Sequence, residues 1–86
     1  MINVEHGQFG SLLAHFFADE KALLSPAAAA AISGFGVKTA LGALELLESE
    51  GILRSSRLGR RRIFSADPGS RFYRRCRLAY AVRQRR

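Results

Sequence analysis

The chain contains 86 residues, of which 48% are hydrophobic and 24% are charged, so it can build one small core but not two. Its net charge of +7 is divided very unevenly. Residues 1–53 carry two basic and six acidic side chains, a net charge of −4, whereas residues 54–86 carry twelve arginines and one acid, a net charge of +11. This asymmetry predicts an anionic partner for the C-terminal third, either a nucleic acid or an anionic membrane surface.

Membrane anchoring is the weaker of these two options. No run of about 18 apolar residues is present, and residues 1–6 lack the basic and apolar regions of a signal peptide. We therefore expect a cytoplasmic, nucleoid-associated protein without a membrane partner. The single cysteine, Cys76, fits a reducing compartment, and we interpret it as a small apolar residue of a helix rather than as a redox centre or metal ligand.

The first predicted helix runs from about Gln8 to Asp19. Its apolar residues recur at the spacing of one buried helical face, and they are Phe9, Leu12, Leu13, Phe16 and Phe17. Residues 22–24 follow as a short apolar segment that can pair as an edge strand.

The second predicted helix has the clearest start in the chain. Ser25 is a favoured N-cap residue, and Pro26 suits the first helical position because its φ is preset. The helix continues through five alanines to Ser33, and Gly34 supplies a left-handed C-cap. We expect Phe35 to fill the core at the corner that follows.

The third predicted helix runs from Val37 to about Glu50, with Gly36 at its start and Gly51 as the residue that ends it. One side carries Val37, Ala40, Leu41, Leu44, Leu47 and Glu48, and the opposite side carries Lys38, Gly42, Glu45 and Ser49. A glycine such as Gly42 costs about 1 kcal/mol relative to alanine in a helix interior. It either allows a partner to approach the backbone closely or is tolerated without a function.

A β-hairpin follows, with strands over residues 52–57 and 61–66 and a turn over residues 58–60. Alternation on the second strand puts Phe64 and Ala66 on one face, which we expect to be the buried one. After a turn at residues 67–69, Ser70 caps a last helix over residues 71–83. Its predicted apolar stripe consists of Phe72, Cys76, Ala79 and Tyr80.

The order of these elements, and the residues from Ser25 to Ala66, resemble the winged helix-turn-helix domain of MarR and ArsR-like transcriptional regulators. The positions that match the pattern of these regulators are Leu47, Glu48, Gly51, Ile52, Leu53, Gly59 and Arg60. The resemblance implies one domain over residues 1–86 with a mainly α, α+β fold. Its three-helix core and wing would span about residues 8–66, and a C-terminal basic helix would span about residues 70–83.

The resemblance also implies how double-stranded DNA would be bound. The second and third helices would form the helix-turn-helix, the third would enter the major groove, and the wing would lie on a neighbouring backbone or minor groove. The groove-facing residues would be Gly36, Lys38, Thr39 and Gly42. Only two of them are polar, and none is the arginine, asparagine or glutamine that reads a base through two hydrogen bonds. Direct sequence discrimination is therefore expected to be modest.

Five arginines of the hairpin are candidates for DNA contact: Arg54, Arg57, Arg60, Arg61 and Arg62. A guanidinium is permanently charged and binds phosphate oxygens through two parallel hydrogen bonds. At the tip, Arg60 or Arg61 could also read the width of a narrow minor groove. The alternative is a solvated, charged hairpin without a ligand, but the helix-turn-helix immediately upstream favours DNA.

Three arginines of the last helix are further candidates: Arg74, Arg75 and Arg77. They either extend the phosphate footprint or keep an exposed helix in solution. The aromatic residues Phe72, Tyr73 and Tyr80 offer a different role for this helix, which is to pack against the first helix of a second subunit. Such a homodimer would bind two half-sites.

An enzyme is not expected. The sequence has two histidines, one cysteine, no glycine motif that cradles phosphate and no clustered metal ligands, so we expect no catalytic residue, metal or cofactor. The sequence predicts a small DNA-binding protein, most simply a transcriptional regulator that is selective for DNA sequence or shape. The alternatives are a winged-helix module for protein interaction and a general nucleic-acid-binding or architectural protein.

Overall fold

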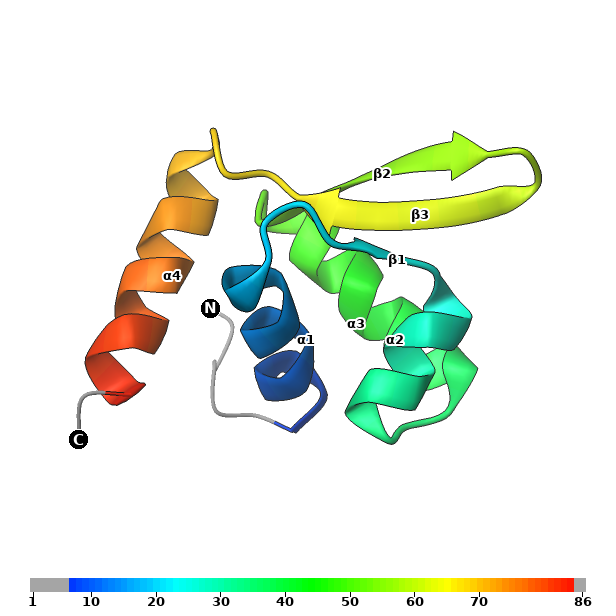
Figure 1. Ribbon diagram of the computed structural model, residues 1–86, viewed down its shortest axis with the longest axis horizontal. Coiled ribbons are helices and arrows are strands. Elements are labelled where there is room, and N and C mark those ends of the chain that lie inside the picture. Colours follow the sequence, from blue (N-terminus) through cyan, green and yellow to red (C-terminus); the bar gives the residue numbers. More distant parts are fainter. Residues whose placement is uncertain (1–6, 85–86) are drawn as a thin grey trace.

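The computed structural model describes residues 7–84, which form four helices and a three-stranded antiparallel sheet, an α+β arrangement (Figure 1). In chain order the elements are α1 (Gly7–Ala18), β1 (Leu23–Leu24), α2 (Pro26–Ser33), α3 (Val37–Ser49), β2 (Leu53–Leu58), β3 (Arg61–Ala66) and α4 (Arg71–Gln84). The predicted order of elements is confirmed. The first strand of the hairpin extends to Leu58, so the turn is shorter than predicted.

The corners between the helices form where the sequence predicts them. The hydroxyl of Ser25 accepts a hydrogen bond from the amide of Ala28 at 3.2 Å, and Pro26 is the first residue of α2. Gly34 (φ 78°) and Gly51 (φ 79°) adopt the left-handed conformation after α2 and α3, which favours glycine. The chain bends by 104° between α2 and α3.

The sheet is ordered β1-β3-β2, so β3 is its central strand. Phe64 of β3 is fully buried and lies opposite Leu24 of β1 and Ser55 of β2. Ala66 is also buried, which confirms the predicted face of this strand. The helices contribute the other core residues, which include Leu12, Leu13, Phe16, Ala29, Ala40, Leu44 and Leu47.

The corner between α2 and α3 does not insert into the core, and the prediction that Phe35 fills the core there is wrong. Phe35 is 42% exposed and Val37 is 52% exposed. The reason is that Ala29 of α2 and Ala40 of α3 are both fully buried. Residues this small let the two helices approach closely, and the larger side chains of the corner stay outside.

The predicted apolar stripe of α4 is half right, because Cys76 and Tyr80 are partly buried against the core but the other two members are not. Phe72 is 48% exposed and Ala79 is exposed, whereas the neighbouring Tyr73 is buried. The ring of Phe17 in α1 decides this orientation, because its centroid lies 5.4 Å from that of Tyr73 and 5.1 Å from that of Tyr80. Aromatic pairs at such distances favour these tilted and edge-to-face contacts.

A polar contact also holds α4 in place. The hydroxyl of Tyr73 donates a hydrogen bond to Oε2 of Glu20 at 2.9 Å, and Nη1 of Arg77 contacts the same oxygen at 2.9 Å. Glu20 lies in the turn between α1 and β1. Therefore α4 is fixed to the rest of the chain through both apolar and polar contacts.

Within residues 7–84, no single helix is long and apolar enough to cross a membrane. Only α2 and α3 taken together, across their 104° bend, meet the requirements of length and composition.

Two glycines give opposite expectations for stability. Gly51→Ala should destabilise the fold by at least about 1 kcal/mol, because alanine is strained in the left-handed region and its Cβ would lie 2.9 Å from Cδ2 of Phe72. Gly42→Ala is the matched control, since a Cβ there meets no atom within 4 Å. In a helix interior that change should stabilise by up to about 1 kcal/mol. Urea unfolding measures both, and an unchanged midpoint for Gly51→Ala would contradict the strained corner.

The stability of the protein should depend on Tyr73 at high pH. Burial and the contact with Glu20 raise the pKa of Tyr73 from 10.0 to about 12. Because the folded-state pKa exceeds the unfolded-state value, the contribution of this group is complete below about pH 10 and is lost as the pH rises toward about 12.

We expect the free energy of unfolding of the wild-type protein to fall over this pH range more steeply than that of Tyr73→Phe. The variant keeps the ring that packs on Phe17 but has no hydroxyl to ionise. Chemical denaturation at several pH values gives both curves. Parallel curves would mean that the hydroxyl is not held as described.

Candidate nucleic-acid interface

The start of α3 is exposed. Gly36, Val37, Lys38 and Thr39 all lie on the surface, and so does Gly42 one turn further along the helix. Gly36 occupies the N-cap position without a side chain, so no side chain caps the first amide groups of α3. Uncapped amides at a helix N-terminus attract anions such as phosphate. This end of α3 therefore offers backbone donors, one ammonium group and one hydroxyl.

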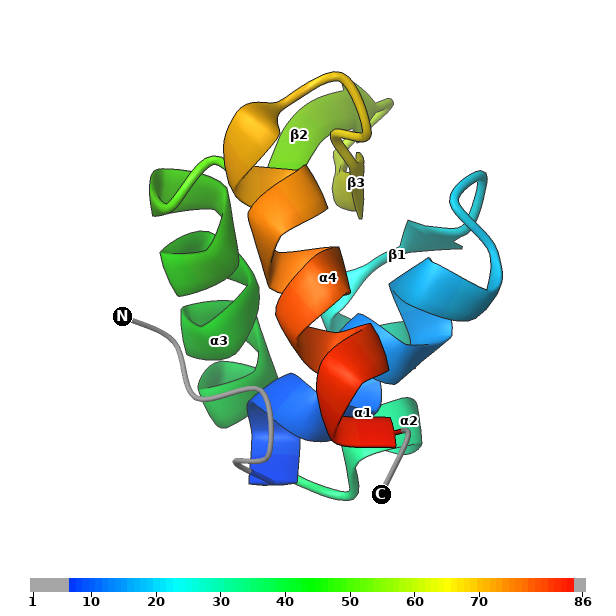
Figure 2. The same ribbon diagram turned by 90° about the vertical axis from the view of Figure 1, so that its left-hand side faces the viewer.

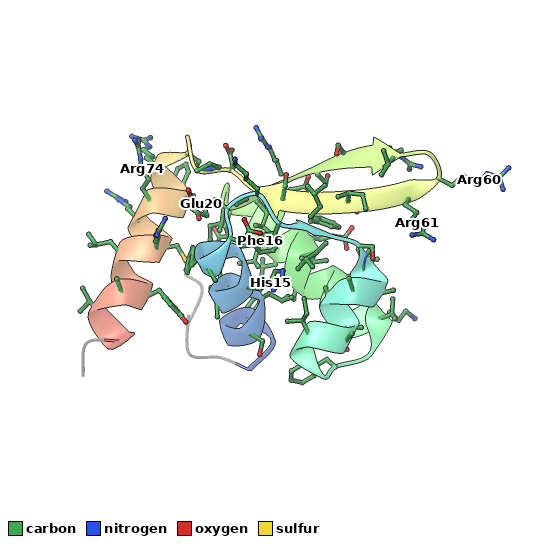
Figure 3. The ribbon with its side chains drawn as sticks, viewed as in Figure 1. His15, Phe16, Glu20, Arg60, Arg61 and Arg74 are labelled. Carbon is green, nitrogen blue, oxygen red and sulfur yellow. The ribbon has the colours of Figure 1, made fainter. Side chains whose placement is uncertain are left out.

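The β2–β3 hairpin extends away from the helices and carries the predicted arginines (Figure 3). A tight turn at Gly59 (φ 65°) puts Arg60 at the tip, where its side chain extends beyond the end of the hairpin. Four of the five arginines are exposed: Arg54, Arg57, Arg60 and Arg61. Among residues 7–84, the ion pairs of the structure leave these four without a carboxylate partner.

The register of the hairpin distributes these arginines over both of its faces. Arg57 pairs with Arg62 across the strands, on the face that carries Phe64, whereas Arg54 and Arg61 belong to the opposite face. With Arg60 at the tip, the guanidinium groups surround the hairpin instead of forming one flat row.

The fifth arginine, Arg62, is bound within the protein. Its Nη1 lies 2.8 Å from Oε2 of Glu45, and its Nη2 lies 2.8 Å from Oε1 of Glu48. The guanidinium carbon lies 4.8 Å from the ring centroid of Phe64, and the hydroxyl of Ser55 donates to the second oxygen of Glu48. The hydrogen bond to Glu45 raises the pKa of Arg62 above its ordinary value, so the side chain stays charged. We call these contacts the Arg62 network.

The Arg62 network has two consequences for the candidate interface. It connects β2 and β3 to α3, so it fixes the direction of the hairpin relative to the exposed start of that helix. It also places a cation against two carboxylates of α3, which would otherwise repel an anion at this surface. The sequence contained one hint, because Glu48 falls on the otherwise apolar side of α3 and needed a partner.

The arginines of α4 are not brought together with those of the hairpin. Arg74 and Arg75 are exposed, whereas Arg77 is paired with Glu20. Figure 1 shows α4 at one end of the molecule and the hairpin tip at the other, and the labelled Arg74 and Arg60 lie at these opposite ends in Figure 3. The candidate DNA-binding residues therefore fall into two separate groups.

His15 of α1 and Cys76 of α4 lie apart from the arginines at the hairpin tip (Figure 1 and Figure 3). Among the residues that the structure describes, no cluster of three or more histidine, cysteine or acidic residues could hold a metal ion. His15 is half-buried with its ring 6.0 Å from that of Phe16, and burial raises the pKa of the Cys76 thiol.

Comparison of the sequence with protein-family models and with curated proteins finds no match. The chemistry of the surface must therefore be interpreted from its own geometry.

The Arg62 network gives a prediction for a double-mutant cycle. Arg62→Ala and Glu48→Gln should each lower the urea midpoint. The loss of stability in the double variant should be smaller than the sum of the two single losses, because both changes remove the same Arg62–Glu48 ion pair. The coupling should shrink at high salt, since the groups are partly exposed. Arg57→Ala is the control on the same hairpin face and should change the midpoint little. Strictly additive losses would contradict the network.

Proposed function

We propose that this protein binds double-stranded DNA as a small winged helix-turn-helix protein, most simply a transcriptional regulator in the cytoplasm. The observation that carries the proposal is the combination of an exposed, uncapped start of α3 with a hairpin on which four of the five arginines have no carboxylate partner within residues 7–84. The 104° bend between α2 and α3 falls within the range of helix-turn-helix units. In this proposal α3 enters the major groove and the hairpin lies beside it.

The distribution of the arginines favours a minor groove as the site of the hairpin. A flat row of cations would suit one line of phosphates. Guanidinium groups on both faces suit an element that lies between two lines of phosphates, which is the arrangement on either side of a minor groove. Arg60 at the tip would then enter the groove and respond to its width, which depends on sequence.

The start of α3 offers limited direct readout. Lys38 and Thr39 are its polar candidates for base contacts. The exposed Val37, which the sequence places on the mostly apolar side of the helix, adds an apolar side chain that can contact the methyl group of thymine. We therefore propose that selectivity comes from a few contacts at α3 together with the shape of the DNA.

A homodimer through α4 would use only part of the predicted aromatic surface. Tyr73 and Tyr80 pack on Phe17 of the same chain, so their rings are not available to contact a second subunit. The large apolar side chains that α4 still exposes are Phe72, Leu78 and Val82. One protomer already contains both elements of the proposed interface, so DNA binding does not require a dimer.

The proposal predicts a steep salt dependence. If each of the four unpaired hairpin arginines neutralises one phosphate, they contribute about 3.6 to the slope of log K against log[salt], at roughly 0.9 per phosphate. Arg60→Ala/Arg61→Ala should reduce the slope by about 1.8 and weaken all duplexes by similar factors. Fluorescence anisotropy with short labelled duplexes at several salt concentrations gives both quantities.

Variants of α3 provide the contrast. Lys38→Ala and Thr39→Ala should change the preference among duplex sequences while the slope changes by at most about one unit. A hairpin double variant that binds as well as the wild type would rule out the hairpin as the contact. A wild-type protein that retains no fragments of genomic DNA would instead support a protein-interaction module.

A further inference from the structure

A second basic surface lies on α4. Arg71, Arg74 and Arg75 are exposed, and their spacing of three and four residues puts them on neighbouring positions of the helix. We call these residues the α4 basic surface. Arg77 is excluded, because it is paired with Glu20. No acidic residue occurs in α4, RFYRRCRLAYAVRQ, so its own side chains do not offset this charge.

The position of α4 separates this surface from the proposed DNA interface. The molecule is 40 Å long, and Figure 1 shows α4 and the hairpin tip at opposite ends of it, with α1 between α4 and the other two helices. In the perpendicular view of Figure 2, α4 faces the viewer and the hairpin lies behind it. A duplex held by the start of α3 and the hairpin tip therefore leaves the outer side of α4 free.

The α4 basic surface is held in a fixed position. Tyr73 and Tyr80 pack on Phe17, and Glu20 binds both the hydroxyl of Tyr73 and the guanidinium of Arg77. These contacts use the inner side of the helix. The exposed arginines are thus presented by a docked element, so a ligand would not have to order a flexible tail.

We propose that the α4 basic surface binds the phosphates of a second DNA duplex, so that one protein molecule bridges two DNA segments. This inference rests on the proposed function, because the first duplex is the one held by the hairpin. All three cations are guanidinium groups, which bind phosphate oxygens through paired hydrogen bonds. A second copy of the chain fits this surface poorly, because two such helices would bring arginines together without a carboxylate.

The bridging can be measured with two duplexes. One is fixed to beads at low density, and a second, labelled duplex of the same sequence is added with the protein. The wild-type protein should retain the labelled duplex on the beads. Arg74→Ala/Arg75→Ala should reduce this retention at least about tenfold, because each lost phosphate contact is a charge-assisted hydrogen bond. Its affinity and salt slope for a single duplex in dilute solution should stay within about twofold of the wild type.

Two further variants complete the design. Arg74→Lys/Arg75→Lys keeps both charges and should retain most of the bridging. Arg60→Ala/Arg61→Ala should weaken binding to the single duplex and bridging together. Urea midpoints confirm that each variant is folded.

Three results would overturn the bridging proposal while leaving the proposed function intact. The first is a wild-type protein that binds one duplex tightly but retains no second one. This result would count against bridging even if α4 bound polyglutamate, a probe for an acidic protein partner. The second is undiminished bridging by Arg74→Ala/Arg75→Ala, which would assign bridging to a dimer. The third is a loss of single-duplex affinity and salt slope in that variant, which would place both basic groups on one duplex. Failure of the wild type to bind any duplex would instead remove the proposed function itself.

Discussion

The register of β3 between β1 and β2 is the constraint on which most of this structure depends. It puts the ring of Phe64 into the core and, two residues earlier on the same face, puts Arg62 over the carboxylates of α3. A shift by one residue would turn both side chains to the opposite face. Core packing and the connection between hairpin and helix therefore favour the same pairing, and a shift of the register would disrupt both.

Three glutamates, Glu20, Glu45 and Glu48, connect the helical part of the chain to its basic part. The ion pairs found within residues 7–84 join an arginine of the basic C-terminal part to a glutamate of the helical part, through Arg62 with Glu45 and Glu48 and through Arg77 with Glu20. Their side chains are between 31% and 50% exposed, so such pairs contribute little to stability. Their larger effect is on orientation, because one pair of contacts directs the hairpin and the other positions α4.

Local signals were sufficient to predict the elements and, to within one residue, their ends. Ser25 and Pro26 define the start of α2 by their own chemistry, and Gly34 and Gly51 define helix ends by their left-handed conformation. Alternation on a strand correctly predicted the burial of Phe64. Each of these features depends on residues that are close in the sequence.

Features that depend on distant residues could not be predicted in the same way. Two overlapping stripes fit α4, one with Phe72 and one with Tyr73, and only the position of Phe17 on another helix selects between them. Arg62 looked like any other hairpin arginine, because its partners lie 17 and 14 residues away on α3. For the candidate site, the sequence therefore indicated which residue types are present. The fold determines which of them are free to bind a ligand.

The Arg62 network also bears on how the proposed complex would select its DNA. A hairpin that moved freely relative to α3 could adapt to grooves of different width and would discriminate poorly by shape. A hairpin held to α3 at Glu45 and Glu48 keeps a set distance between its tip and the start of that helix. DNA whose groove geometry matches this distance would bind without distortion, whereas other sequences would have to deform at an energetic cost. With few polar side chains at the start of α3, a fixed spacing of this kind would be the main physical basis for selectivity in the proposed complex.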